Sequence, residues 1–376
     1  MNSLFTPKYI RKIKGVYVLW FEKSNKYIVL NGGNMNVVNA YLNSENEAEF
    51  SNTLKNSTNT NLKFLFKEVS QLLYNCNKPN ALFASKKVTL GNFDNWLSHL
   101  YTVNETSFEI NYSSERVKKL IHPQFQHISK IQSKTSPDAF FHIYLENNQL
   151  HLFTNKVHIS SFPKEEYHLL QGKFAMELLC LLTHKKEHDW LGTFHASTIA
   201  NNKEAIMLIG ESGRGKSTLS ALLMANGFNL IADDFTPVLA KTQTIYNYPS
   251  AISIKEGAFK TLESYIQNFD NLETYIVKSS KGKIRYLPAN NSWNQKDLNC
   301  NKIVLVNYEE HADVSIDALN IEDALNVLIP DSWISPLPEH AKIFMNWLDS
   351  CNFYKLTYSK ADDAISKFQT LLKPLT

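Results

Sequence analysis

The feature that most constrains this chain is a glycine-rich segment that joins an apolar strand pattern to a helix pattern. Residues 205–209 are all apolar, as in strands that are buried on both faces. They lead directly into GESGRGKS at 210–217, which matches the spacing GxxxxGK[ST]. The next residues place leucines on one face of a helix that should end at Asn226 and Gly227. This order of strand, turn and helix predicts an α/β fold with parallel strands.

The glycine-rich segment has the composition of a loop that binds phosphate. Glycines allow backbone angles that place successive amide hydrogens around an anion without a Cβ atom in the way. Lys216 can reach the terminal phosphates, Ser217 can ligate Mg²⁺, and the dipole of the following helix points at the same anion. The predicted binding residues are Gly210, Glu211, Ser212, Gly213, Arg214, Gly215, Lys216, Ser217 and Thr218. They predict binding of a nucleoside triphosphate, ATP with Mg²⁺; the alternative is a glycine turn without a ligand.

A pair of aspartates and one histidine extend this prediction. Residues 228–232 form a second apolar strand pattern, and Asp233 and Asp234 follow at its carboxyl end, where α/β sheets bind ligands. One acid beside a triphosphate can hold Mg²⁺ while the other accepts a proton from an attacking hydroxyl. The alternative is a solvated turn. His195 lies upstream of the loop, and taken alone it is better interpreted as a buried structural histidine.

The remaining pattern divides the chain into three regions. Residues 1–80 combine strand patterns with three helix patterns, and an Asn-rich stretch that contains Pro79 marks their end. Residues 81–190 contain strand patterns and then, at 165–183, a helix pattern so widely apolar that the helix should be largely buried. Residues 191–376 alternate strands and helices. We therefore expect a small N-terminal domain, a connecting α+β region and an α/β nucleotide-binding domain.

The bulk composition excludes some partners. Lys and Arg number 39 against 36 Asp and Glu, so the formal charge of +3 gives no sign of a nucleic-acid surface. The four cysteines are widely spaced, without a CxxC pair, as expected of free thiols in a reducing compartment. The basic start precedes an apolar run too short for a signal peptide, and no apolar stretch approaches the length of a membrane span. We expect a cytoplasmic protein with neither nucleic acid nor membrane as a partner.

The motifs over residues 190–240 resemble the HPr kinase/phosphorylase family. The resemblance rests on HASTI from His195, GESGRGKSTL from Gly210, a helix ending in Gly227, and LIADD from Leu230. It implies a phosphoenolpyruvate-carboxykinase-like fold and the transfer of phosphate from ATP to a serine of a protein.

The resemblance also implies roles for individual residues. Lys216 grips the phosphates, while Ser217 and Asp233 serve the metal. Asp234 is the base that deprotonates the acceptor hydroxyl. His195 matches the family's histidine near the active site, which makes it a candidate catalytic residue.

Weaker similarity continues downstream of residue 240. The segments YPS, IKEG and RYLP, which begin at Tyr248, Ile254 and Arg285, resemble divergent relatives found with peptide-modifying gene clusters. Lys255 and Arg285 are therefore candidates for contacting phosphate or substrate; the alternative is that both are ordinary solvated cations. The glycine-rich segment that supports metal binding and phosphorolysis in true HPr kinases has no counterpart here. Neither HPr as the substrate nor the reverse reaction is expected.

The first 80 residues resemble a different family. Paired strands, the second at 26–31, followed by three helices look like a PqqD-type peptide recognition domain, a small winged-helix-like module. Such domains capture a leader peptide as an added strand at a sheet edge. Fusion to a kinase would raise the effective concentration of a tethered substrate. The alternative is a winged-helix-like module with another use.

These resemblances together imply an ATP-dependent serine kinase acting on a peptide or protein, such as a ribosomally made precursor peptide held by residues 1–80. Two alternatives remain open: a kinase for a small molecule such as free serine or a sugar, and a nucleotide-gated peptide-binding protein without phosphotransfer. Because HPr kinases assemble as hexamers, the resemblance also allows a homo-oligomer.

Overall fold

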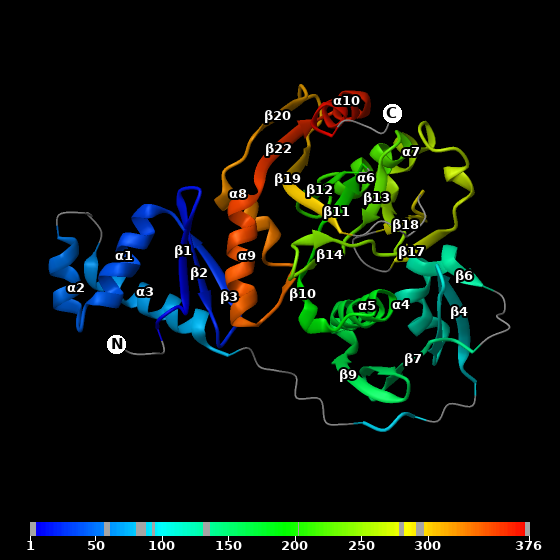
Figure 1. Cartoon of the computed structure of the whole chain (residues 1–376), viewed down its shortest axis with the longest axis horizontal. Helices are drawn as coiled ribbons and strands as arrows, with labels where there is room; N and C mark the ends of the chain where they lie inside the picture. The colour runs from blue at the N-terminus through cyan, green and yellow to red at the C-terminus, as the bar shows by residue number, and fades with distance from the viewer. Residues whose placement is uncertain are drawn as a thin grey trace.

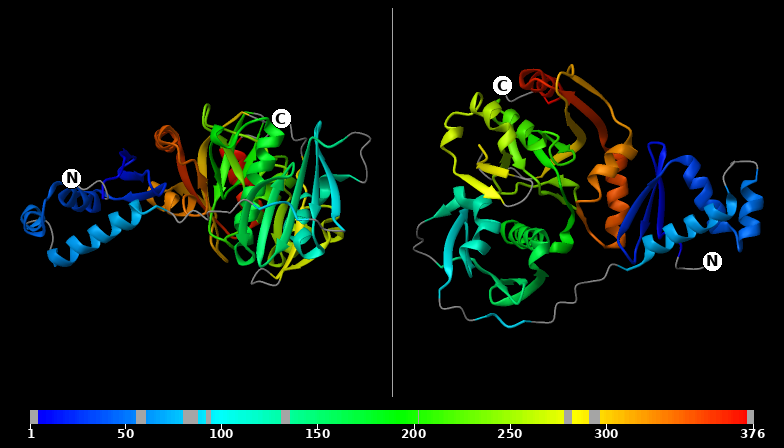
Figure 2. Two further views of the ribbon diagram at one scale, coloured as in Figure 1. Left: turned by 90° about the horizontal axis from the view of Figure 1, so that it is seen from below. Right: turned by 180° about the vertical axis from the view of Figure 1, so that it is seen from behind.

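The chain folds into a mixed α/β structure in which an N-terminal unit lies to one side of the remaining sheets (Figure 1). Seen from below, this unit projects from one end of the molecule (Figure 2). The computed structural model describes residues 5–55, 61–79, 88–91, 95–130, 136–201, 203–277, 282–290 and 297–372. Parts of the expected boundary near residue 80 lie outside these ranges.

The N-terminal unit is a three-stranded antiparallel sheet followed by three helices. Its elements are β1 (Tyr9–Ile13), β2 (Val16–Phe21), β3 (Lys26–Leu30), α1 (Gly32–Asn43), α2 (Glu47–Leu54) and α3 (Leu62–Asn77). The helices start where Asn31, Asn46 and Asn61 accept hydrogen bonds from first-turn amides. Both predicted strands and all three predicted helices are confirmed, but β1 was not predicted because its sequence, YIRKI, lacks an alternation of apolar and polar residues.

The second region is a six-stranded sheet with two helices on one face. Its elements are β4 (Leu97–Val103), β5 (Thr106–Tyr112), α4 (Glu115–Phe125), β6 (Ser129–Lys130), β7 (Ala139–Glu146), β8 (Gln149–Thr154), β9 (Val157–Pro163) and α5 (Tyr167–Thr183). The prediction that the helix over 165–183 is largely buried is confirmed, since Leu170, Phe174 and Leu178 are fully enclosed. Helix α4, which contains Pro123, was not predicted.

The third region is built on a ten-stranded mixed sheet. Its strands are β10 (Trp190–Phe194), β11 (Ser197–Ala200), β12 (Glu204–Ile209), β13 (Asn229–Ala232), β14 (Thr236–Leu239), β15 (Thr244–Ile245), β19 (Leu298–Tyr308), β20 (Ser315–Ala318), β21 (Trp333–Ile334) and β22 (Asn352–Tyr358). The expected parallel members are confirmed, because β12 pairs in parallel with β19 and β19 with β22. Strand β11 separates β12 from β13 and runs antiparallel to both.

Helices cover both faces of this sheet. Helices α6 (Lys216–Ala225) and α10 (Ala361–Leu371) pack on one face, and α8 (Ile321–Leu328) and α9 (Pro338–Ser350) pack on the other. Strand β12 supplies both cores: Ile206 and Leu208 face α6, whereas Met207 and Ile209 face α8 and α9. The apolar run at 205–209 is thus a strand buried on both sides, as predicted. Within the described residues, no helix is both long and apolar enough to cross a bilayer.

A small three-stranded sheet stands beside α6. It contains β16 (Ile252–Lys255), β17 (Thr274–Val277) and β18 (Gly282–Leu287), with the short helix α7 (Phe259–Glu263) between β16 and β17. Ile252 and Ile254 join the core that includes Leu219 of α6. Just before β16, the amide of Ala251 donates to the Gln124 carbonyl at 2.9 Å, which ties this part of the chain to α4.

The N-terminal sheet is packed between two layers of helices. One face contacts α1 and α3, and the other contacts α8 and α9. On the second face the ring of Tyr27 meets Phe344 edge to face at 5.1 Å, and Phe344 stacks on Phe194 of the central sheet at 5.9 Å. At the β2–β3 turn, Asn25 donates its side-chain amide to the Ile334 carbonyl at 2.6 Å. The N-terminal unit therefore shares a core with the central sheet.

Candidate functional site

The predicted phosphate loop lies between the end of β12 and the start of α6. Gly213 and Gly215 have φ angles of 92° and 89°, a region that other residues rarely adopt. A Cβ atom at Gly215 would also lie 2.9 Å from the Tyr358 hydroxyl oxygen. Side chains cap the helices of the N-terminal unit, but no side chain caps α6. Its first-turn amides are therefore available to an anion, which the dipole of the helix attracts.

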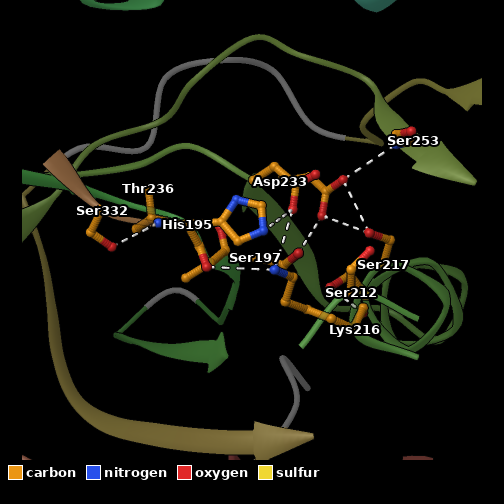
Figure 3. A network of polar contacts seen from close by, with 12 residues as sticks. His195, Ser197, Ser212, Lys216, Ser217, Asp233, Thr236, Ser253 and Ser332 are labelled. Carbon is orange, nitrogen blue, oxygen red and sulfur yellow. Dashed lines mark hydrogen bonds and ion pairs between the residues drawn. The ribbon is translucent and has the colours of Figure 1, made fainter. Parts of the chain in front are cut away.

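The strand order brings the other predicted residues to the same edge of the sheet. Strands β12 and β13 both end at this edge, and the antiparallel strand β11 between them begins there. Asp233 and Asp234 follow β13, while His195 comes just before β11. These two segments thus meet beside Lys216 and Ser217 (Figure 3).

Asp233 is buried and held by hydrogen bonds from three directions. Its carboxylate accepts from the Ser217 hydroxyl at 3.3 Å, from the Ser253 backbone amide at 3.3 Å, and from the Ser197 hydroxyl (Figure 3). Burial, and then the negative charge of Asp234, raise the pKa of Asp233 well above the ordinary value of an aspartic acid. Such a carboxylate is stabilised in its ionised form by a cation placed beside it.

Asp234 differs from its neighbour in exposure and in partners. Its side chain is 46% exposed and lies 3.3 Å from the Lys216 ammonium and 3.8 Å from Nε2 of His195. Its backbone is in the left-handed region, with φ of 60°, which a residue other than glycine adopts at a cost. This conformation places the two consecutive aspartates in different environments: Asp233 is buried, whereas Asp234 is partly exposed beside Lys216.

His195 is fixed through its backbone and leaves its ring beside Asp234. The backbone amide donates to the Ser332 hydroxyl at 3.1 Å, and the carbonyl accepts from the Lys216 ammonium at 3.5 Å. The side chain is 38% exposed. The structure therefore places His195 at the rim of the site, whereas the sequence taken alone favoured a buried structural role.

The donors around Asp233 match the preferences of Mg²⁺. This ion takes oxygen ligands, retains several waters, and is usually held by one or two carboxylates together with substrate phosphates. Ser217 and Asp233 offer neighbouring oxygens, and the Lys216 ammonium contacts Asp234. Among the described residues, no group of three or more His, Cys, Asp or Glu side chains is arranged to hold a metal alone. Ser217 and Asp233 thus suit a metal that arrives with its nucleotide.

The two downstream cations lie in different places. The ammonium of Lys255 donates to the Ser212 hydroxyl in the phosphate loop at 2.9 Å, so β16 brings it to the site. Arg285 pairs with Ile254 across the small sheet, on the opposite face from Lys255. Its guanidinium lies 3.2 Å from a Glu263 carboxylate oxygen and 4.4 Å from the centre of the Phe259 ring. The structure brings Lys255, but not Arg285, to the loop.

Several residues near the site were given no role in the sequence analysis. Ser197 and Ser253 contact Asp233, one through its hydroxyl and the other through its backbone amide. Tyr286 lies opposite Ser253 across the small sheet. Burial, and then the charge of Asp234, raise the pKa of Tyr286 to about 12. Strand pairing, which a single sequence does not reveal, brings these residues together.

The fold and the site together define a mixed α/β protein with a strand–loop–helix unit of the phosphate-loop type. No family model matches this chain, and no curated protein matches it. Among solved structures, the HPr(Ser) kinase/phosphatase from Coxiella burnetii is similar, with 13% identity, over 48% of this chain and 90% of that chain, at a TM-score of 0.22. A likeness at that TM-score carries no argument of its own, so the functional assignment rests on the geometry of the site.

Proposed function

We propose that this protein is an ATP-dependent kinase that transfers the terminal phosphoryl group to a hydroxyl, a serine of a peptide or protein. The supporting observation is the convergence of Lys216, Ser217, Asp233 and Asp234 beside a glycine loop with uncapped helix amides. Phosphoryl transfer needs mainly positioning and the neutralisation of charge, which these groups supply. A glycine turn that binds no ligand does not require a buried carboxylate next to the loop serine, because burying that group costs free energy.

In this proposal Lys216 changes partner when nucleotide binds. Its ammonium contacts the Asp234 carboxylate and the His195 carbonyl, and a triphosphate in the loop offers it a stronger anionic partner. Lys216 and the amides of α6 then hold and orient the phosphates. Mg²⁺ held by Ser217 and Asp233 would neutralise charge on the phosphate oxygens. The carboxylate of Asp234, released from the ammonium, becomes available to an incoming hydroxyl.

Asp234 is then the base of the transfer step. The acceptor oxygen forms a bond to the terminal phosphorus as the bond from that phosphorus to the bridging oxygen breaks, and ADP leaves with the electron pair. The hydroxyl proton passes to the Asp234 carboxylate. His195, 3.8 Å from that carboxylate, orients it and stabilises its charge.

The N-terminal unit supplies the peptide-binding part of the proposal. Strands β1 and β3 are the edges of its sheet. In the described chain, neither Tyr9–Ile13 nor Lys26–Leu30 makes a backbone hydrogen bond to a strand other than β2. An extended peptide can add to such an edge. Because the unit packs on α8 and α9, a peptide bound there has a raised effective concentration at the loop.

The decisive variant is Lys216→Ala. We expect it to abolish labelled phosphate transfer from ATP to serine-containing peptides, because it removes the ammonium that the proposal assigns to the phosphates. Lys241→Ala is the matched control: this exposed lysine lies in the β14–β15 turn, at the end of the sheet where β19 begins. Equal transfer by both variants would remove Lys216 from the mechanism. Nucleotide binding by the wild-type chain without transfer to any peptide would favour the binding-protein alternative.

A further inference from the structure

A cavity lies on the flank of the phosphate loop opposite the aspartate pair. Its volume is about 380 Å³, within the range of small-molecule sites, and it is formed where β19 and β22 end. Tyr308 forms part of its wall, and the Ser359 hydroxyl donates to the Ala312 carbonyl at 2.8 Å, which joins the two segments around it. The cavity plays no part in the site described above.

The cavity adjoins the phosphate loop through Tyr308, which lines the cavity and packs beside Gly215. The backbone amide of Tyr308 donates to the Arg214 carbonyl at 3.1 Å. Built on Gly215, a Cβ atom would lie 3.1 Å from Cβ of Tyr308 and 2.9 Å from the Tyr358 hydroxyl oxygen. Tyr308 is 43% exposed, and its ring meets that of Tyr358 edge to face at 5.6 Å. The exposed ring of Tyr308 thus lies next to the loop and packs against the buried ring of Tyr358.

The direction of a bound triphosphate follows from the strand order. Asp234 and His195 mark the reactive end, on the β11 and β13 side of the loop strand β12. Strands β19 and β22 lie on the other side of β12 (Figure 1). Because the three phosphates form a linear chain, a terminal phosphate directed toward Asp234 sends the nucleoside toward the ends of β19 and β22.

The charges of the cavity suit a nucleoside better than further phosphate. Glu310, Asp313 and Asp363 line it together with a single ammonium group, that of Lys360. An excess of carboxylates repels phosphate, whereas carboxylate oxygens accept hydrogen bonds from ribose hydroxyls and from amino groups of a base. The Tyr308 ring offers a stacking surface to any base.

We propose that this cavity is the nucleoside subsite, in which the base stacks on Tyr308 and the carboxylates accept from the ribose. The inference rests on the proposed function, since it extends the same nucleotide site. It assigns the nucleoside half of the ligand to the ends of β19 and β22, a region in which the sequence patterns marked no ligand residue.

Binding of two probes, Mg²⁺-ATP and Mg²⁺-tripolyphosphate, to the full chain tests the subsite by calorimetry. Tripolyphosphate occupies the loop but lacks a nucleoside. We expect Tyr308→Ala to weaken ATP binding by about tenfold, the effect typical of losing one stacked base, and to leave tripolyphosphate binding unchanged. Tyr308→Phe, which keeps the ring, should retain the affinity for ATP. Tyr74→Ala is the matched control, because Tyr74 on α3 has the same exposed fraction of 43% as Tyr308.

The outcomes separate the subsite from the function on which it rests. Unchanged ATP binding by Tyr308→Ala would overturn the subsite. Equal losses for ATP and tripolyphosphate would also overturn it, since they would show that Tyr308 supports the loop through Gly215 and does not contact the nucleoside. Failure of the wild-type chain to bind either probe would instead contradict the proposed function.

Discussion

In the proposed function the phosphate loop and the N-terminal unit both bind their ligands through backbone groups, but they arrange these groups in different ways. In the loop, residues 210–215 turn from the end of β12 into α6, which begins without a side-chain cap. In the N-terminal unit, the edges of β1 and β3 extend their backbone groups along a line. The loop therefore suits one compact anion, whereas a sheet edge suits an extended chain. The difference fits the proposed division of roles, in which the loop carries the reaction chemistry and the N-terminal unit binds the peptide.

The largest expected effect is on the rate of phosphate transfer, and it tests whether Asp234, beside the phosphate loop, takes part in the reaction. Asp234→Asn should lower kcat for phosphate transfer by about 10²- to 10⁴-fold, because an amide cannot accept the hydroxyl proton. ATP binding should not weaken, since the change removes a negative charge from beside Lys216. Single-turnover transfer and calorimetry measure the two quantities. Asp317→Asn on the edge strand β20 is the control, and undiminished transfer by Asp234→Asn would exclude this residue as the base.

The second prediction tests whether the N-terminal unit is firmly packed on the central sheet, as the shared core implies. Phe344→Ala should lower the free energy of unfolding by about 3 to 5 kcal/mol, because this fully buried ring contacts Tyr27 of the N-terminal sheet and Phe194 of the central sheet. Chemical denaturation followed by tryptophan fluorescence gives the value. Phe64→Ala, at a side chain that is 59% exposed, is the control and should change stability by less than about 0.5 kcal/mol. A loss below about 1 kcal/mol for Phe344→Ala would show that the shared core is not formed.

That interface also limits how the recognition role can be tested. Removing residues 1–80 would leave Phe344 and its neighbours on α9 without the sheet that covers them. Loss of activity in such a truncation would then report misfolding as readily as loss of peptide binding. Substitutions at the sheet edges of the full chain are the better approach.

The smallest expected effect concerns the folding free energy that is lost by burying the ionised carboxylate of Asp233. Its pKa is raised by burial and by Asp234, so ionisation opposes folding, and this cost develops as pH rises above the ordinary pKa of an aspartic acid. Asp233→Asn removes the cost, with its carbonyl oxygen accepting from the Ser253 amide and its amide donating to the serine hydroxyls.

At pH 8 the nucleotide-free Asp233→Asn protein should therefore have a free energy of unfolding higher than that of the wild type by on the order of 1 to 3 kcal/mol, and a higher melting temperature. The difference should shrink as pH falls and disappear toward about pH 3, below the ordinary pKa of an aspartic acid, where the wild-type carboxyl is protonated in both the folded and unfolded states. Calorimetric melting over this pH range measures it. The same variant should lose the contribution of Mg²⁺ to nucleotide binding. A lower melting temperature at pH 8 would contradict the account of Asp233.

The sequence predicted the local features of this molecule well, for a physical reason. Strand β12, the loop and α6 are contiguous, so the apolar run at 205–209 and the glycine spacing report directly on their structure. Contacts between segments that are distant in the sequence produce no local pattern from which they could be predicted. The sequence did not indicate that Ser197 and Ser253 meet at Asp233, or that Arg285 turns away from the loop toward Glu263 and Phe259. Strand β1 was missed because one of its faces is solvated, which weakens its apolar pattern.

The central claim is that the loop holds a triphosphate with its terminal phosphate directed at Asp234. A crystal structure with a non-hydrolysable ATP analogue and Mg²⁺ tests it most directly. The account predicts phosphates within Gly210 to Thr218, the metal between Ser217 and Asp233, and the terminal phosphate contacting Lys216 within reach of Asp234. A loop without phosphate, or a terminal phosphate pointing toward Tyr308 and away from Asp234, would contradict it.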